Sequence, residues 1–145
     1  MGRYERCVNS SGTIKDDFIL VVEDNLADSY VLARYLRAAG LNVVETRSIA
    51  EAKSAIPRGP LIAFIDVGLP DGDGMELCRE IKQHPETSHI SVVLVSATRN
   101  TDSGLSAFLE CGAHTLLVKP VVVEELIPLV HSLVKSATAE RDSRA

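Results

Sequence analysis

The sequence predicts an α/β protein in which helices cover both faces of a doubly wound parallel sheet. Short apolar runs alternate with amphipathic segments five times between about residues 18 and 135, and short loops connect them. This alternation is typical of repeated βα units, whose strands pair in parallel. Three of the apolar runs end directly in charged residues. This second observation fits such a sheet, because its ligands bind at the carboxyl ends of the strands.

The first two βα units occupy the N-terminal part of this pattern. A strand over about 18–22 precedes a helix that Gly40 ends, since glycine often follows the last turn of a helix. The apolar face of this helix is formed by residues at helical spacing: Val31, Leu32, Tyr35, Leu36 and Ala39. A second strand is predicted at about 42–46. Ser48 and Glu51 form a capping-box pattern that opens the second helix.

Three further strands are predicted, at about 61–65, 91–95 and 115–118. Asp73 and Glu76 resemble a cap pair for the third helix, and a fourth helix over about 101–110 is intrinsically weak because it contains glycine and serines. The fifth helix is predicted to run from about Val123 to Lys135. It should bend at Pro128, because proline removes one backbone hydrogen bond from a helix.

The chain is predicted to be one domain over residues 18–135, between flexible polar tails at 1–17 and 136–145. A net charge of −5 argues against binding to nucleic acid, which requires a basic surface. No apolar stretch approaches the roughly 20 residues needed to span a bilayer. The three cysteines (Cys7, Cys78 and Cys111) show neither zinc-ligand spacing nor a disulfide framework, which fits a reducing cytoplasm.

Acidic and basic residues follow three of the predicted strands. Glu23 and Asp24 follow the first strand, Asp66 the third and Lys119 the fifth. Five βα units with acids after the first and third strands suit the flavodoxin-like strand order 2-1-3-4-5, an order taken from known doubly wound folds. In that order the first and third strands are neighbours, so the three carboxylates should meet.

Three carboxylates at one point repel one another, and a hard dication would relieve that repulsion. Mg²⁺ commonly takes one or two carboxylates together with phosphate oxygens. A carboxylate such as Asp66 can attack a phosphoryl group to form an acyl phosphate, and Lys119 would neutralise part of the charge on the transferred group. Ser96, at the end of the fourth strand, is the candidate hydroxyl donor. Taken singly, these residues could instead be helix or turn caps.

Other candidate sites are weaker. The four histidines (His84, His89, His114 and His131) show no metal spacing and are expected on the surface. Residues 71–74 carry Asp and Gly as in a calcium loop, but no acid follows at the required offset, so a turn is expected. A phosphatase that forms its own aspartyl phosphate would need a second Asp two positions after the nucleophile. That position is Gly68.

The combined motifs resemble the receiver domain of two-component response regulators. The resemblance rests on the segments 21–25 (Val-Val-Glu-Asp-Asn), 66–72 (Asp-Val-Gly-Leu-Pro-Asp-Gly), 96–97 (Ser-Ala) and 119–120 (Lys-Pro). It implies that Asp66 accepts a phosphoryl group from a phosphohistidine on a sensor histidine kinase or a histidine phosphotransfer protein. It also implies that Asp24 and Asp66 bind Mg²⁺ directly, that Glu23 acts on it mostly through water, and that the Gly68 carbonyl is a ligand. Ser96 and Lys119 would then read the phosphorylated state.

The resemblance further implies a signalling switch that changes its affinity for a downstream protein, and not an enzyme with a separate substrate. Family context also predicts a cis bond before Pro120. Two positions depart from the family pattern, because Leu116 replaces the usual aromatic switch residue and Val121 the common phenylalanine. Two alternatives remain open: a degenerate receiver that binds proteins without phosphorylation, and a receiver excised from a hybrid histidine kinase.

Overall fold

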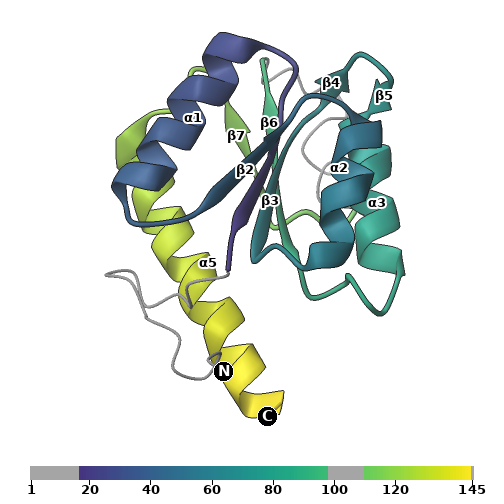
Figure 1. The fold of residues 1–145 in the computed structure, drawn as a ribbon, viewed down its shortest axis with the longest axis vertical. Coiled ribbons are helices and arrows are strands. Elements are labelled where there is room, and N and C mark those ends of the chain that lie inside the picture. The colour runs from purple at the N-terminus through teal and green to yellow at the C-terminus, as the bar shows by residue number, and fades with distance from the viewer. Residues whose placement is uncertain (1–16, 98–109, 145) are drawn as a thin grey trace.

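The computed structural model describes residues 17–97 and 110–144, which form a five-stranded parallel sheet with helices on both faces (Figure 1). The sheet consists of β1 (Ile19–Val22), β2 (Val43–Thr46), β3 (Ile62–Asp66), β6 (Ser91–Ser96) and β7 (Thr115–Val118). Its order is β2-β1-β3-β6-β7. Counted along the chain these are strands 2-1-3-4-5, so the predicted flavodoxin-like order is confirmed.

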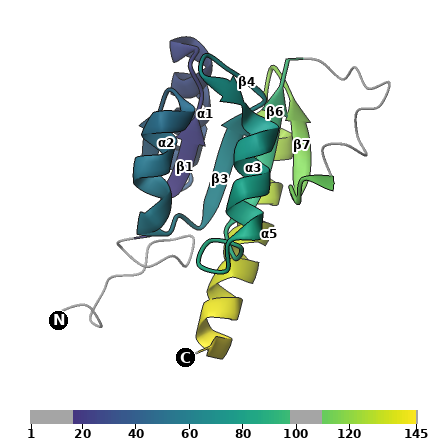
Figure 2. The same cartoon turned by 90° about the vertical axis from the view of Figure 1, so that its right-hand side faces the viewer.

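The helices lie in two layers. Helices α1 (Leu26–Ala38) and α5 (Val123–Arg144) cover one face of the sheet. On the other face lie α2 (Ile49–Ala55), the 3-10 turn η1 (Ile56–Arg58) and α3 (Gly74–Gln83), with α2 and α3 side by side in Figure 2. The predicted fourth helix falls almost entirely outside the described residues.

The core is divided by the sheet into two apolar clusters. Alternate residues of β1 point to opposite faces, so that Leu20 packs with α2 and α3 whereas Val21 packs with α1 and α5. Phe64, at 1% exposure the largest fully buried side chain, lies in the second cluster. Burial on both faces explains why these strands read as uninterrupted apolar runs.

Cys78 and Cys111 are buried in the apolar cluster between the sheet and α3 and form no disulfide with each other, as expected for small core residues. The Cys78 thiol donates a hydrogen bond to the Cys111 carbonyl at 3.4 Å. Burial is the main cause that raises the pKa of Cys78 to about 12, which keeps the thiol protonated.

The helix starts follow the predicted cap chemistry. The Ser48 hydroxyl accepts a hydrogen bond from the Glu51 N–H at the start of α2, and the Asp73 carboxylate accepts one from Met75 N at the start of α3. Gly40, after α1, has a φ of 90°, which an L side chain rarely adopts. The peptide bond between Lys119 and Pro120 is cis, as the family resemblance predicted.

The structure corrects the end of the last helix. Helix α5 continues past the predicted end at Lys135 to Arg144, so residues 136–144 are helical and not an irregular tail. No glycine or proline interrupts the sequence there, and Ala137 still packs against the core. The C-terminal part of α5 extends past the sheet in Figures 1 and 2. Pro128 lies inside this helix, and the bend there stays a prediction.

The segment after β3 also differs from its prediction. Residues 71–74 were expected to form a turn, but Gly72 and Asp73 form a short strand, β5 (Gly72–Asp73), which pairs with β4 (Gly68–Leu69) in a small antiparallel hairpin. Within the part of the chain that the structure describes, no helix has the length and apolar character needed to cross a bilayer.

Candidate functional site

The strand register brings the predicted site residues to one edge of the sheet. Val22 of β1 pairs with Ile65 of β3, and Asp66 pairs with Val95 of β6. Ser96 pairs with Val118 at the end of β7. Parallel strands in this register end at the same level, so Glu23, Asp66, Ser96 and Lys119 all emerge at the carboxyl edge.

Three carboxylates meet at this edge. Glu23, Asp24 and Asp66 each offer one oxygen, and these oxygens lie within 4.8 Å of one another. Glu23 and Asp66 are buried, whereas Asp24 is exposed. Among the described residues this is the one group of three or more His, Cys, Asp and Glu side chains close enough to share an ion. The donor set is all oxygen, which suits a hard dication such as Mg²⁺.

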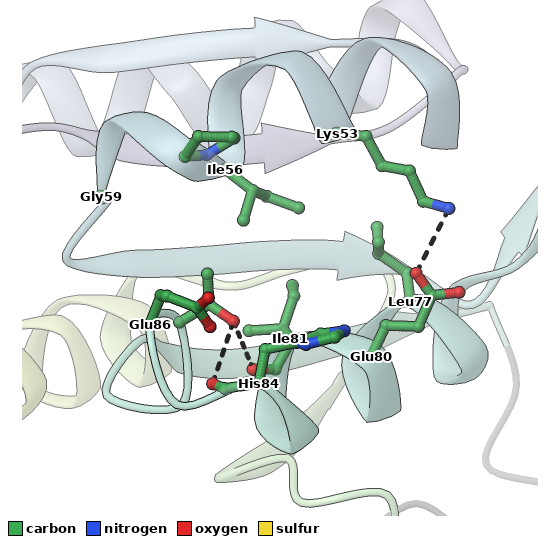
Figure 3. A pocket seen from close by; sticks show the side chains of 10 residues that line it. Lys53, Ile56, Gly59, Leu77, Glu80, Ile81, His84 and Glu86 are labelled. Atoms are coloured by element: carbon green, nitrogen blue, oxygen red, sulfur yellow. Dashed lines mark hydrogen bonds and ion pairs between the residues drawn. The ribbon is translucent and has the colours of Figure 1, made fainter.

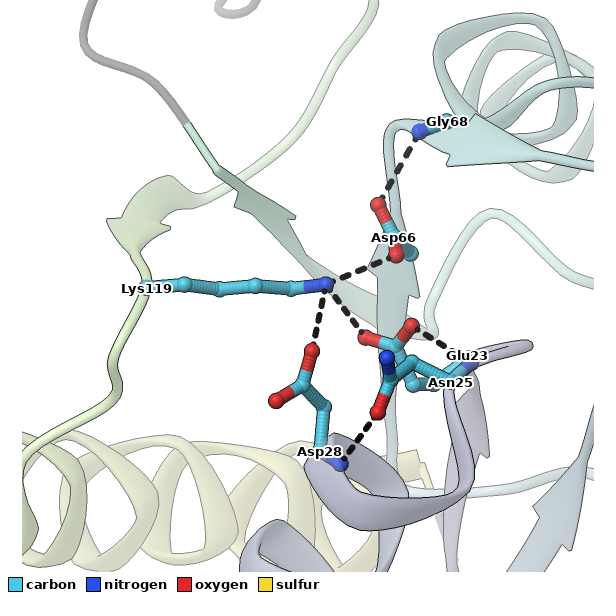
Figure 4. Close-up of polar contacts among 6 residues, drawn as sticks. All are labelled: Glu23, Asn25, Asp28, Asp66, Gly68 and Lys119. Carbon is cyan, nitrogen blue, oxygen red and sulfur yellow. Dashed lines mark hydrogen bonds and ion pairs between the residues drawn. The ribbon is translucent and has the colours of Figure 1, made fainter.

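The ammonium of Lys119 contacts two of these carboxylates (Figure 4). Its Nζ lies 2.9 Å from Glu23 Oε1 and 2.9 Å from Asp66 Oδ2. The lysine comes from the loop directly after β7, where its own N–H donates to the Ser96 carbonyl at 2.9 Å. The structure therefore brings together the acids after the first and third strands and the lysine after the fifth.

A third carboxylate on Lys119 was not predicted from the sequence. Asp28 Oδ2 lies 3.1 Å from Lys119 Nζ. Asp28 belongs to the first turn of α1, and its N–H donates to the side chain of the helix cap Asn25 at 3.0 Å. The sequence offered one signal for this contact: Asp28 is an acid in the first turn of the helix that begins at the carboxyl edge of the sheet.

Burial shifts the protonation of Glu23. It is the main cause that raises the pKa of Glu23 to about 7, and the neighbouring Asp66 raises it further. Hydrogen bonds from Lys119 and from the Asn25 N–H, at 3.1 Å, act in the opposite direction. Burial and the neighbouring acid therefore disfavour the ionised form of Glu23 more than its hydrogen bonds favour it.

For Lys119, hydrogen bonds outweigh the effect of burial on the pKa. Its partial burial, the largest single influence, disfavours the charged form, but hydrogen bonds to Glu23, Asp66 and Asp28 outweigh it and raise the pKa of Lys119 above its usual range. The lysine is therefore a permanent cation near neutral pH. It can neutralise an anion that arrives at Asp66.

Asp66 is held by the loop that follows it. The N–H of Gly68 donates to Asp66 Oδ1 at 3.0 Å, while Oδ2 faces Lys119. The backbone of Gly74, at the start of α3, packs so closely on the Asp66 carbonyl that a Cβ there would overlap it. Glycine at this position lets α3 begin directly against the end of the strand that carries Asp66.

The hairpin after Asp66 is anchored to α2. Both carboxylate oxygens of Asp71 accept backbone hydrogen bonds from the first turn of α2, from Ile49 N at 2.9 Å and from Ala50 N at 3.1 Å. The bond from Ile49 is the main cause that lowers the pKa of Asp71 below its ordinary value. The segment that carries Gly68 is thus tied to a neighbouring helix by a second cap that sequence reasoning missed.

Ser96 lies at the end of β6 and is 5% exposed. It occupies the same edge as Asp66 and Lys119, where a hydroxyl donor was expected. The four histidines are all exposed, as expected, and none belongs to the acidic cluster.

One groove described in the structure lies away from these residues. It has a volume of about 550 Å³ and is lined by η1 and α3, with the Lys53–Glu80 ion pair at 3.2 Å on one side (Figure 3). No residue of the acidic cluster lines it, and Lys119 does not either. The charged residues at the strand ends, which form the candidate functional site, therefore lie outside this groove.

Known proteins share this fold and sequence pattern. Residues 19–131 match the family described as "Response regulator receiver domain". The KDP operon transcriptional regulatory protein KdpE of Escherichia coli is 36% identical over 109 residues, which cover 74% of this chain and 47% of KdpE. The chain spans about half the length of this and similar curated relatives.

Two solved structures of response regulators are similar to this chain. A putative response regulator from Chloroflexus aurantiacus is 31% identical with a TM-score of 0.77, and the match covers 83% of this chain and 99% of that one. The Mn²⁺-bound form of the response regulator Rcp1 is 28% identical with a TM-score of 0.65, over 81% of this chain and 91% of Rcp1.

Proposed function

The chain belongs to the response regulator receiver domain family, and from this membership we propose that it is a signalling switch controlled by phosphorylation of Asp66. The observation that carries the proposal is the convergence of Asp66 with Lys119, at 2.9 Å, inside a cluster of three carboxylates. A carboxylate nucleophile, a fixed cation and a set of oxygen ligands are the parts that phosphoryl transfer requires.

In the proposed reaction, an oxygen of Asp66 attacks the phosphorus of a phosphohistidine. The new O–P bond forms as the N–P bond breaks, and the electron pair of that bond returns to the imidazole nitrogen. Lys119 stabilises negative charge on the transferred group, and the Gly68 N–H keeps the carboxylate oriented through Oδ1. The hydroxyl of Ser96 is proposed to donate to a phosphoryl oxygen.

We propose Mg²⁺ as the cation of this site. Glu23, Asp24 and Asp66 would hold it, together with the carbonyl of Gly68. The convergence of three carboxylate oxygens within 4.8 Å supports this assignment, because an all-oxygen donor set suits a hard dication. The Mn²⁺-bound form of Rcp1 is a response regulator structure with a divalent ion. When bound, Mg²⁺ supplies charge neutralisation for the carboxylates and for the phosphoryl group.

The proposed donor is a sensor histidine kinase or a histidine phosphotransfer protein, and the proposed output is a changed affinity for a downstream protein. The chain would assist its own phosphorylation and dephosphorylation without acting on another substrate. We place it in the cytoplasm, in keeping with the reduced state of Cys78 and Cys111. A receiver from a hybrid histidine kinase would carry the same site.

The test is mass spectrometry of the intact protein after incubation with acetyl phosphate and Mg²⁺. We expect wild type to gain one hydroxylamine-sensitive phosphoryl group and Asp66→Asn to gain none. Asp71→Asn, which changes a carboxylate in the same loop, should still be phosphorylated. A wild-type protein that remains unmodified would reject the proposal in favour of a degenerate receiver.

A further inference from the structure

We propose that Asp28 is a positioning residue that holds Lys119 in its resting place and competes with the phosphoryl group for the lysine ammonium. This inference rests on the proposed function of Asp66. It concerns a residue outside the acidic cluster, and one that neither touches the proposed ion nor accepts the phosphoryl group.

The Lys119 ammonium has a limited number of hydrogen-bond donors. An ammonium group has three N–H donors and no acceptor. Three carboxylates surround it, at 2.9 Å for Glu23, 2.9 Å for Asp66 and 3.1 Å for Asp28. The three contacts match the number of donors, so Lys119 has no donor left for a further anion unless one of these contacts changes.

The three partners of Lys119 are not equivalent. The side chains of Glu23 and Asp66 are 6% and 9% exposed and belong to the acidic cluster, whereas the side chain of Asp28 is 45% exposed and lies outside it. Asp28 can be rehydrated at low cost when its contact breaks, because water already reaches it. It is therefore the partner that is most easily exchanged.

The position of Asp28 is nevertheless well defined. Its N–H is bonded to the side chain of Asn25, and the N–H of Asn25 is bonded to Glu23 Oε2 at 3.1 Å (Figure 4). A carboxylate in the first turn of α1 is also favoured by the positive end of the helix dipole. These contacts fix the backbone of Asp28 on the helix side of the site, and its carboxylate reaches Lys119 from there at 3.1 Å.

The charge of Asp28 should weaken the contact between Lys119 and a phosphoryl group on Asp66. A phosphoryl group on Asp66 brings additional anionic oxygens toward Lys119, and the charge of Asp28 then competes for the same ammonium and repels the new group. Asparagine has the same shape without the charge. Removing the charge should strengthen binding of a phosphoryl group by about two- to fivefold, the range of a partly exposed ion pair.

The experiment measures the affinity of beryllofluoride, an analogue of the aspartyl phosphate, at saturating Mg²⁺ by ¹⁹F NMR. Asp28→Asn and a second neutral variant, Asp28→Ser, should bind it about two- to fivefold more tightly than wild type. Asp28→Glu, which restores the charge, should return toward wild type. Glu76→Gln is the matched control, because it removes a first-turn acid from α3 that pairs with Arg79 and does not contact Lys119.

A double-mutant cycle separates this role from a structural one. In a Lys119→Gln background the Asp28→Asn substitution should no longer change beryllofluoride affinity, because the ammonium for which it competes is gone. Unchanged or weaker binding by both neutral variants, or an equal effect in the Lys119→Gln background, would overturn the inference. Failure of wild type to bind beryllofluoride at all would instead reject the proposed function.

Discussion

Replacing Glu23 with Gln should stabilise the protein in the absence of divalent cations. Glu23 has only 4% of its surface exposed, and it lies beside Asp66 and Asp24. Glutamine keeps the shape of the protonated glutamic acid and removes the negative charge that burial disfavours. The effect should depend on pH, because the charge of Glu23 does.

The magnitude follows from its pKa. The pKa of Glu23 rises from 4.5 to about 7 in the folded protein, a difference of about 2.5, or about 3 kcal/mol at about 1.4 kcal/mol per pKa unit. The folded protein binds this proton more tightly than the unfolded chain does. Its free energy of unfolding therefore falls as pH rises from about 4.5 to about 7, and the loss is complete above that window.

The assay is urea denaturation in EDTA at pH 5 and pH 8. Glu23→Gln should exceed wild type by up to about 3 kcal/mol at pH 8 and by much less at pH 5. Glu86→Gln removes a carboxylate from an exposed position and serves as the control. Mg²⁺ at pH 8 should stabilise wild type more than Glu23→Gln, because the variant lacks one of the three carboxylates.

Parallel pH profiles for wild type and Glu23→Gln would refute this reasoning. They would show that Glu23 ionises in the folded protein as it does in the unfolded chain. The acidic cluster would then tolerate its charge without a cation, and the electrostatic support for Mg²⁺ would be lost.

Five further substitutions, at four positions, test the supports of the site. Gly74→Ala should lower the free energy of unfolding by about 1–3 kcal/mol, because the added methyl group would overlap the Asp66 carbonyl. Gly68→Ala is the control and should change urea denaturation little, because the space around Gly68 is open. Equal losses in the two variants would contradict this prediction. Asp71→Ala should lower the thermal midpoint by a few degrees through loss of the second cap on α2, and Asp71→Asn by less; an unchanged midpoint would show that the cap contributes nothing. Lys119→Met should destabilise the metal-free protein at pH 8 by about 3 kcal/mol in urea denaturation, because it leaves two buried carboxylates without the ammonium group that pairs with them. In the same assay, Mg²⁺ should increase the stability of this variant more than that of wild type.

The sequence carries enough information for the sheet and for the residues at its carboxyl edge. Strands buried on both faces appear as apolar runs, and β7 was predicted at residues 115–118, the range it occupies. Parallel pairing then determines which strand ends meet. This is why Glu23, Asp66 and Lys119 could be placed together before any coordinates were known.

Other features depend on geometry that periodicity does not encode. Asp28 reaches Lys119 because of how α1 is rotated about its axis on the sheet, and the caps that Asp71 adds to α2 join residues more than 20 positions apart. Strands of two residues, such as β4 and β5, are too short to show alternation. The predicted end of α5 at Lys135 was wrong, because a polar composition does not end a helix when no helix-breaking residue is present.

The attachment of the hairpin to α2 has a consequence for sequence variation. Asp71 supplies acceptors for two N–H groups at the beginning of α2, in addition to the one supplied by Ser48. A homologue that loses the acid at position 71 must leave those groups to water or provide another acceptor. We therefore expect position 71 and the residues that begin α2 to change together during evolution, although they belong to different βα units.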